Sequence, residues 1–141
     1  MPGGVDALRG KVDGFLKGTF AGVSVDDAGD FMIPFDDVMV WVRPVEWTEG
    51  RTIARVWSIT NVGMPVDGDL TKFLVTSNTK LMIGGFRLDE GGPAVMIVHS
   101  LLGDDLDQME LVASVAAVAG AADHYAAEIK ERFGGKLFTE S

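Results

Sequence analysis

Four carboxylates stand within one short stretch of the chain, residues 103–111, which reads GDDLDQMEL. Carboxylates this close together are the side chains that bind a divalent cation or share a proton in acid/base catalysis. A calcium loop of the EF-hand kind requires a glycine at its sixth position and a glutamate at its twelfth, and this stretch has neither in place. A calcium site of that kind is therefore not predicted here.

The same stretch has the pattern of a helix N-terminus. Asp107 and Glu110 have the spacing of a capping box, in which each side chain accepts a hydrogen bond from the backbone N–H of the other. Acidic side chains near the first turn also interact favourably with the helix dipole. We therefore predict that a helix begins at this pair, and we assign Asp104 and Asp105 no role beyond surface charge.

The two histidines are the other candidates for chemistry, because an unperturbed histidine titrates near neutral pH. His99 lies in an apolar segment that alternates like a strand, and we interpret it as a half-buried structural side chain. His124 lies in the last predicted helix, one turn before Glu128, and we interpret the two as an exposed pair on the helix surface. A zinc site needs three or four converging ligands, and the sequence does not indicate such a set.

Motifs for catalysis or nucleotide binding are missing from the sequence. There is no cysteine, which excludes thiolate catalysis, disulfides and cysteine-ligated zinc. There is no Gly-x-Ser-x-Gly motif, no phosphate-binding loop and no dinucleotide fingerprint. The sequence therefore predicts a protein that is not an enzyme and that uses no metal and no cofactor.

Length and charge limit the remaining classes. A chain of 141 residues is long enough to form one hydrophobic core, so we predict a single domain over residues 1–141. With 21 acidic and 12 basic residues the net charge is −9, which repels nucleic acid and anionic membranes. The start of the chain lacks the pattern of a signal peptide, and no segment is long and apolar enough to span a bilayer. The expected location is the cytoplasm.

Hydrophobic periodicity predicts an α+β fold in the order α-ββββ-α-ββ-α. The short connections favour an antiparallel sheet with the helices packed on one side. Pro44 predicts a sheet edge or a bulge, and Asn78 predicts a left-handed helix end. The predicted elements are a helix at 5–20, two short strands within 22–35, a hairpin at 38–47 and 51–62, a helix at 67–78, a hairpin at 80–90 and 92–102, and a helix at 107–133.

The long predicted hairpin has two apolar faces. A one-sided antiparallel sheet normally alternates apolar and polar residues, but here valine and alanine alternate with tryptophan, methionine and arginine. Aromatic residues, methionine and arginine are enriched at the centres of protein interfaces. We therefore predict that this second set faces outward and binds a partner or a second copy; in the alternative, the tryptophans form the core and the valines the exterior. The predicted contact residues are Met39, Trp41, Arg43, Ile53, Arg55 and Trp57.

Two segments of the sequence resemble a known family. NTKLMIGGFRLDEGG and SLLGDDLDQMELVASVAAVAGAADHYAAEIKERFGG are similar, in this order, to the YbjN and type III secretion chaperone-like group, especially its actinobacterial YbjN domain proteins. The resemblance extends over about residues 35–135. It implies a non-enzymatic α+β domain, often dimeric, that holds a peptide segment of a client or partner protein. The family has no common catalytic residues to transfer to this chain.

The sequence and the resemblance together favour a chaperone-like module that binds a peptide segment or a partner protein, as a homodimer. An alternative is a small apolar ligand-binding domain with a cavity under the C-terminal helix. A third hypothesis, a hydrolase or metal enzyme, requires a histidine beside converging carboxylates. The identity of the client and the geometry of the dimer are not encoded in any motif.

Overall fold

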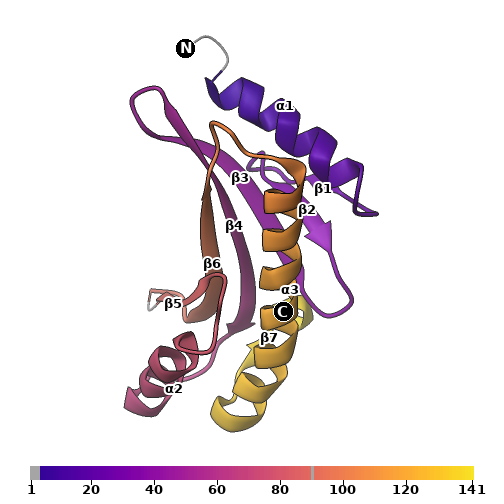
Figure 1. Cartoon of the computed structure of the whole chain (residues 1–141). Coiled ribbons are helices and arrows are strands. Elements are labelled where there is room, and N and C mark those ends of the chain that lie inside the picture. The colour runs from indigo at the N-terminus through magenta and orange to yellow at the C-terminus, as the bar shows by residue number, and fades with distance from the viewer. Residues whose placement is uncertain (1–3, 90) are drawn as a thin grey trace.

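The computed structural model describes residues 4–89 and 91–141. Figure 1 shows one elongated sheet with helix α3 running along it, α1 crossing one end and α2 beside β5 at the other. The elements are α1 (Gly4–Lys17), β1 (Ser24–Val25), β2 (Phe31–Pro34), β3 (Met39–Thr48), β4 (Arg51–Val62), α2 (Gly68–Asn78), β5 (Gly85–Asp89), β6 (Ala94–Leu102), α3 (Gln108–Phe133), β7 (Lys136–Leu137) and a 3-10 helix, η1 (Phe138–Glu140).

The sheet is antiparallel, with the strand order β1-β2-β3-β4-β6-β5, and β7 pairs with β4. This confirms the predicted fold class, and the order of elements along the chain is the predicted one up to α3. β2 pairs with β3 only from Met39 to Val42, so Pro44 lies where β3 has become an edge strand. An edge is the position where a residue without an N–H donor is tolerated, as predicted for Pro44.

The three helices pack on one side of the sheet. Alternate residues of β3 and β4 point to opposite faces, and the set that includes Val40 and Val56 is fully buried against α1 and α3. A second cluster joins α2 to the C-terminal half of α3. Its buried members are Met64, Leu70, Leu74, Val95, Tyr125 and Ile129.

Helix α2 begins and ends where predicted, but its end has a different conformation from the predicted one. The Asp67 side chain caps it by accepting a hydrogen bond from the backbone N–H of Leu70. Asn78 does not adopt the predicted left-handed conformation, because the last turn continues into Thr79, whose φ of −67° is right-handed. The Asn78 side chain instead accepts a hydrogen bond from the N–H of Phe86 at 2.6 Å. This contact ties the end of α2 to the start of β5.

The carboxylate-rich stretch 103–111 forms the start of α3. The Asp107 side chain accepts from the N–H of Glu110 at 2.8 Å, and the Glu110 side chain accepts from the N–H of Asp107 at 3.0 Å. Asp104, to which the sequence assigned only surface charge, accepts hydrogen bonds from Thr52 and Arg51 of β4. The bond from Arg51 is the main reason why the pKa of Asp104 is lowered. Asp104 therefore fastens the loop before α3 to the tip of the β3–β4 hairpin.

Replacing Asp107 by alanine is expected to lower the free energy of unfolding by about 1 kcal/mol, because the backbone N–H of Glu110 loses its acceptor, the Asp107 carboxylate. Asp105→Ala is the matched control, since Asp105 is an exposed acidic residue two positions earlier. Urea unfolding of both variants measures the difference. Equal stability of the two variants would show that the cap does not hold the helix.

Candidate functional site

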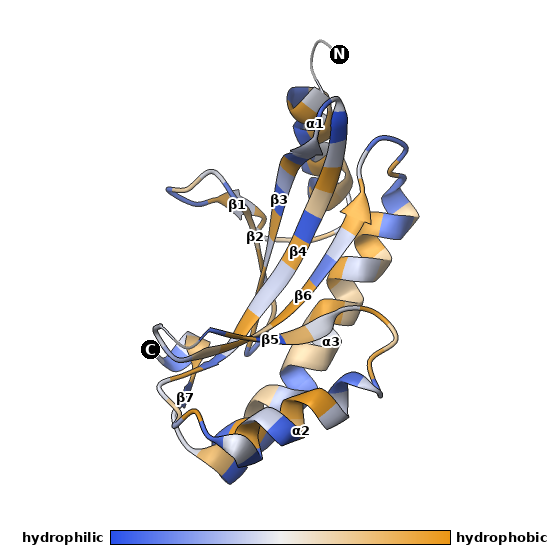
Figure 2. Ribbon diagram, turned by 90° about the vertical axis from the view of Figure 1, so that its left-hand side faces the viewer, coloured by the Kyte–Doolittle hydropathy of each residue, from blue (hydrophilic) through white to orange (hydrophobic). Residues whose placement is uncertain are grey.

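The six predicted contact residues lie together on the sheet face that points away from α1 and α3. Trp41 stands directly opposite Trp57 in the pairing of β3 with β4, and Arg43 stands directly opposite Arg55. Figure 2 shows hydrophobic and hydrophilic residues alternating along these two strands. We call this surface the outer face. It contains all six predicted contact residues, namely Met39, Trp41 and Arg43 of β3 and Ile53, Arg55 and Trp57 of β4.

The two tryptophans differ in how far they are open to solvent. Their rings stack at 6.1 Å with an interplanar angle of 11°. Trp57 is half-buried, whereas Trp41 is only 8% exposed because Phe138 packs edge-on against it at 5.3 Å. The alternative of a tryptophan core does not hold, since the valines of the same strands pack against the helices. Trp57 is thus the open tryptophan of the pair.

Arg43 is held in place by a buried carboxylate. Its Nε and Nη2 donate to the two oxygens of Asp30 at 2.6 and 2.8 Å, and Asp30 is 3% exposed. This bidentate bond raises the pKa of Arg43, and the guanidinium also lies 5.3 Å from the centre of the Trp57 ring. The Arg43 guanidinium is therefore held in one position beside Trp57, because its bidentate contact with Asp30 has the geometry that arginine and carboxylate favour.

A hollow of about 150 Å³ opens on the outer face next to Trp57. Strands β5 and β6 contribute residues that the sequence analysis did not select, although the alternation along both strands could have identified them. We call this hollow the arginine hollow. Its lining residues are Arg43, Arg55, Trp57, Arg87, Met96 and Val98.

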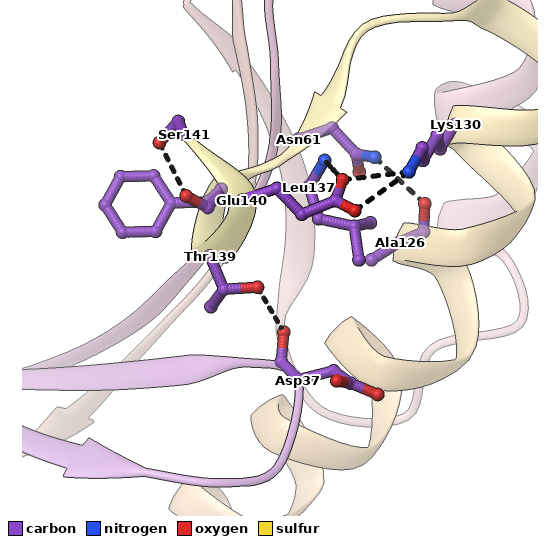
Figure 3. A network of polar contacts seen from close by, with 9 residues as sticks. Asp37, Asn61, Ala126, Lys130, Leu137, Thr139, Glu140 and Ser141 are labelled. Carbon is purple, nitrogen blue, oxygen red and sulfur yellow. Dashed lines mark hydrogen bonds and ion pairs between the residues drawn. The ribbon is translucent and has the colours of Figure 1, made fainter.

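The C-terminal segment 136–141 folds back onto the edge of the outer face. The sequence predicted no helix or strand in this segment. β7 pairs with the end of β4, where Leu137 lies opposite Asn61. Lys130 of α3 donates to both carboxylate oxygens of Glu140 at 2.9 Å, and Glu140 also accepts from the N–H of Leu137 (Figure 3). These contacts lower the pKa of Glu140, and the hydrogen bond from Lys130 has the largest effect. The segment is thereby positioned to place Phe138 against Trp41.

Gly135→Ala is expected to detach this segment. Gly135 has a φ of +73°, and an added Cβ would lie 2.5 Å from the carbonyl oxygen of Val62. Left-handed backbone alone costs alanine about 1–2 kcal/mol. Hydrogen–deuterium exchange measured by mass spectrometry should show faster exchange over residues 136–141.

Gly120→Ala serves as the control for that variant, because a Cβ at Gly120 in α3 meets nothing within 4 Å. Exchange of the C-terminal segment is expected to stay at the wild-type rate in this control. Slow exchange in Gly135→Ala would mean that the segment is not held by its pairing with β4.

The histidines are not arranged for catalysis. His99 lies on the helix-facing side of β6, opposite Val56, and burial lowers its pKa. His124 is exposed and packs edge-on against Tyr125, while Glu128 pairs with Arg132 at 3.1 Å and not with His124 as predicted. In the described ranges, 4–89 and 91–141, no three His, Asp or Glu side chains are grouped as a metal site requires.

Other hollows are open grooves at the surface. One lies between α2 and α3, and another lies between α3 and the turn that connects β2 to β3. The space between α3 and the sheet is filled by fully buried side chains such as Ile97, Leu111 and Val115. This packing disfavours the alternative of an apolar cavity under the C-terminal helix. None of the helices in the described part of the chain has the length and apolarity needed to cross a membrane.

The fold is that of type III secretion chaperones and YbjN. A chain of the HopA1–SchA chaperone–effector complex superposes with a TM-score of 0.62 at 12% identity, covering 84% of this chain and 92% of that one. A chain of the ExsC–ExsE complex gives a TM-score of 0.58 at 19% identity, covering 86% and 91%. YbjN from E. coli gives 0.59 at 15% identity, covering 89% and 90%.

Residues 6–141 match the family described as T3SS (YopN, CesT) and YbjN peptide-binding chaperone 1. The chain belongs to this family, which confirms the resemblance predicted from the sequence. No curated protein matches the sequence at a significant level.

Proposed function

We propose that this chain is a non-enzymatic, chaperone-like module that binds a peptide segment or a partner protein, acts as a homodimer in the cytoplasm, and makes contact through its outer face. Membership of a peptide-binding chaperone family supports the general mode. Two of the similar folds come from a chaperone–effector complex and from the ExsC–ExsE complex, which is consistent with a protein or peptide as the client.

The observation that carries the proposal is the composition of a sheet face that none of α1, α2 and α3 covers. Met39, Ile53 and Trp57 are each half-buried there, where a one-sided sheet usually presents polar residues. Removing such partly exposed apolar surface from water contributes about 25 cal/mol per Å². Trp57 beside the fixed guanidinium of Arg43 has the character of an interface hot spot.

The non-enzymatic part of the proposal rests on where the chemically active side chains lie. Asp107 and Glu110 are engaged in the capping box of α3, and Asp104 is engaged with Thr52 and Arg51. His99 faces the helices. A general base must be free to accept a proton from a substrate, and side chains that already accept structural hydrogen bonds or face the core are poorly placed for this.

Size-exclusion chromatography with light scattering tests the homodimer. The expected mass is about twice the 15.1 kDa of one chain, falling toward one chain on dilution. Trp57→Ala should shift this equilibrium toward the monomer if the copies meet through the outer face. A monomer at every concentration would overturn the homodimer, and a dimer unaffected by Trp57→Ala would place its contact elsewhere.

A further inference from the structure

The arginine hollow gathers positive charge in an acidic protein. Arg43 and Arg55 lie directly opposite each other on adjacent strands, and Arg87 of β5 completes the lining. Like charges directly opposite each other in a sheet are destabilising. A chain of net charge −9 with 12 basic residues nevertheless places three of its arginines around one small hollow. Such a cluster is suited to a ligand that carries negative charge.

The charge of the hollow is only partly neutralised from within. Asp30 forms an ion pair with Arg43. No ion pair within the described residues involves Arg55 or Arg87. None of the lining residues is acidic. Arginine presents a planar set of N–H donors that matches a carboxylate with two parallel hydrogen bonds. Arg55 and Arg87 are therefore the groups available to bind an external carboxylate.

The floor of the hollow is apolar. The ring of Trp57 and the side chains of Met96 and Val98 lie between the arginines, and all three are half-buried. A ligand that fills the hollow must therefore present a carboxylate and an apolar group close together. Side chains two positions apart in an extended peptide can supply both, since residues i and i+2 point to the same face and a strand rises about 3.3 Å per residue.

Charge complementarity separates the candidate occupants. Nucleic acid is disfavoured because the protein as a whole repels phosphate. A second copy whose two-fold axis passed through this hollow would bring its own arginines against Arg43 and Arg55, since residues at the axis meet the same residues of the other subunit; a homodimer that meets through another part of the outer face is not affected by this repulsion. A peptide with acidic side chains next to apolar ones meets neither obstacle.

We propose that the arginine hollow selects extended client segments in which an acidic residue stands two positions from an aromatic or large aliphatic residue, with Arg55 and Arg87 binding the carboxylate and Trp57 the apolar side chain. This inference rests on the proposed function, because it names the class of peptide that the outer face takes. In this proposal Arg55 and Arg87, and not only the tryptophans, determine which peptides bind.

The experiment is a selection of random 12-residue peptides displayed on phage against the immobilised full chain. Peptides enriched in Asp or Glu two positions from Phe, Trp, Leu or Met are expected, relative to the starting library. One enriched peptide is then synthesised with a fluorescent label, together with a version in which Gln or Asn replaces the acidic residues. Fluorescence anisotropy should show about tenfold tighter binding of the acidic version, the equivalent of 1.4 kcal/mol.

The variants assign this preference to the hollow. In the double variant Arg55→Gln/Arg87→Gln the two peptides are expected to bind within about twofold of each other. The double variant Lys72→Gln/Arg132→Gln is the control, because it also removes two positive charges, from α2 and α3, outside the arginine hollow. It should keep the tenfold preference. Circular dichroism and thermal unfolding confirm that the variants are folded.

Each outcome separates this inference from the proposed function. Enriched peptides that are neutral or basic, yet lose binding in Trp57→Ala, would overturn the acidic preference and leave the outer face as the binding surface. An acidic preference that survives in the double variant would overturn the assignment to Arg55 and Arg87. Loss of self-association in the double variant, with no change in peptide binding, would identify a second copy as the occupant. No enrichment on the wild-type chain would overturn both proposals.

Discussion

Trp57→Ala should weaken binding of a client peptide by about 30-fold, which corresponds to about 2 kcal/mol, the size of an interface hot spot. The reason is the position of the ring, which is half-buried on the outer face and forms the floor of the arginine hollow beside Arg43. Isothermal titration calorimetry with a peptide from the selection measures the change. Trp57→Phe should recover part of the affinity, because a smaller aromatic ring remains.

The chain offers a matched control for this prediction. Trp47 lies near the far end of β3 and is 57% exposed, outside the arginine hollow. Trp47→Ala is expected to bind the peptide within about twofold of the wild type. Equal losses in Trp47→Ala and Trp57→Ala would contradict the assignment of peptide binding to the arginine hollow. A loss of the stacked contact with Trp41 also lowers stability by about 0.5–1.5 kcal/mol, so binding is compared below the unfolding transition of each variant.

Two neighbouring residues of β6 are expected to respond in opposite ways to truncation. Ile97 is fully buried in the core between the sheet and the helices, and Ile97→Ala should lower the free energy of unfolding by about 2–5 kcal/mol. Met96 points to the other face, where it lines the arginine hollow and is half-buried. Met96→Ala should lower the free energy of unfolding by less than about 1 kcal/mol while weakening peptide binding.

Chemical unfolding and peptide titration of both variants test which face is the core. If Met96→Ala proved to be the more destabilising variant, the core would lie on the tryptophan side and the outer face would be wrongly assigned. If Ile97→Ala also lost peptide binding while remaining folded, the binding surface would extend to the helix side. Adjacent positions on one strand keep the local backbone the same in the two measurements.

The alternation of residues along β3 and β4 was sufficient to predict the outer face. Trp41 and Trp57 share a face with Arg43 and Arg55 because a strand has a side-chain period of two. The capping box at Asp107 was equally accessible, since it depends on residues three positions apart. Local spacing therefore predicted both the start of the long helix and the surface proposed to bind clients.

Contacts between distant segments could not be predicted in the same way. Phe138 covers Trp41 only because Gly134 and Gly135, both with positive φ, turn the chain after α3 back toward β4. Asp104 reaches Thr52 across 52 positions, so no local pattern could reveal its role.

The arginine hollow shows the same limit, because it depends on which strands are neighbours. Arg87 of β5 joins Arg55 of β4 only because β6 lies between their strands in the sheet. Helix α2 ends at Asn78 as predicted, but the left-handed conformation predicted for that end was wrong for a related reason. The Asn78 side chain is engaged by Phe86 of a later strand, and that contact replaces a local left-handed end.

The central claim is that a client peptide binds on the outer face, and the three tryptophans of the chain provide the direct measurement. Fluorine NMR of protein labelled with 5-fluorotryptophan gives one signal for each of Trp41, Trp47 and Trp57, assigned by single replacement with phenylalanine. During titration with a selected peptide, the Trp57 signal should shift most and the Trp47 signal should stay in place. A shift confined to Trp47, or saturable binding that moves none of the three signals, would contradict the account.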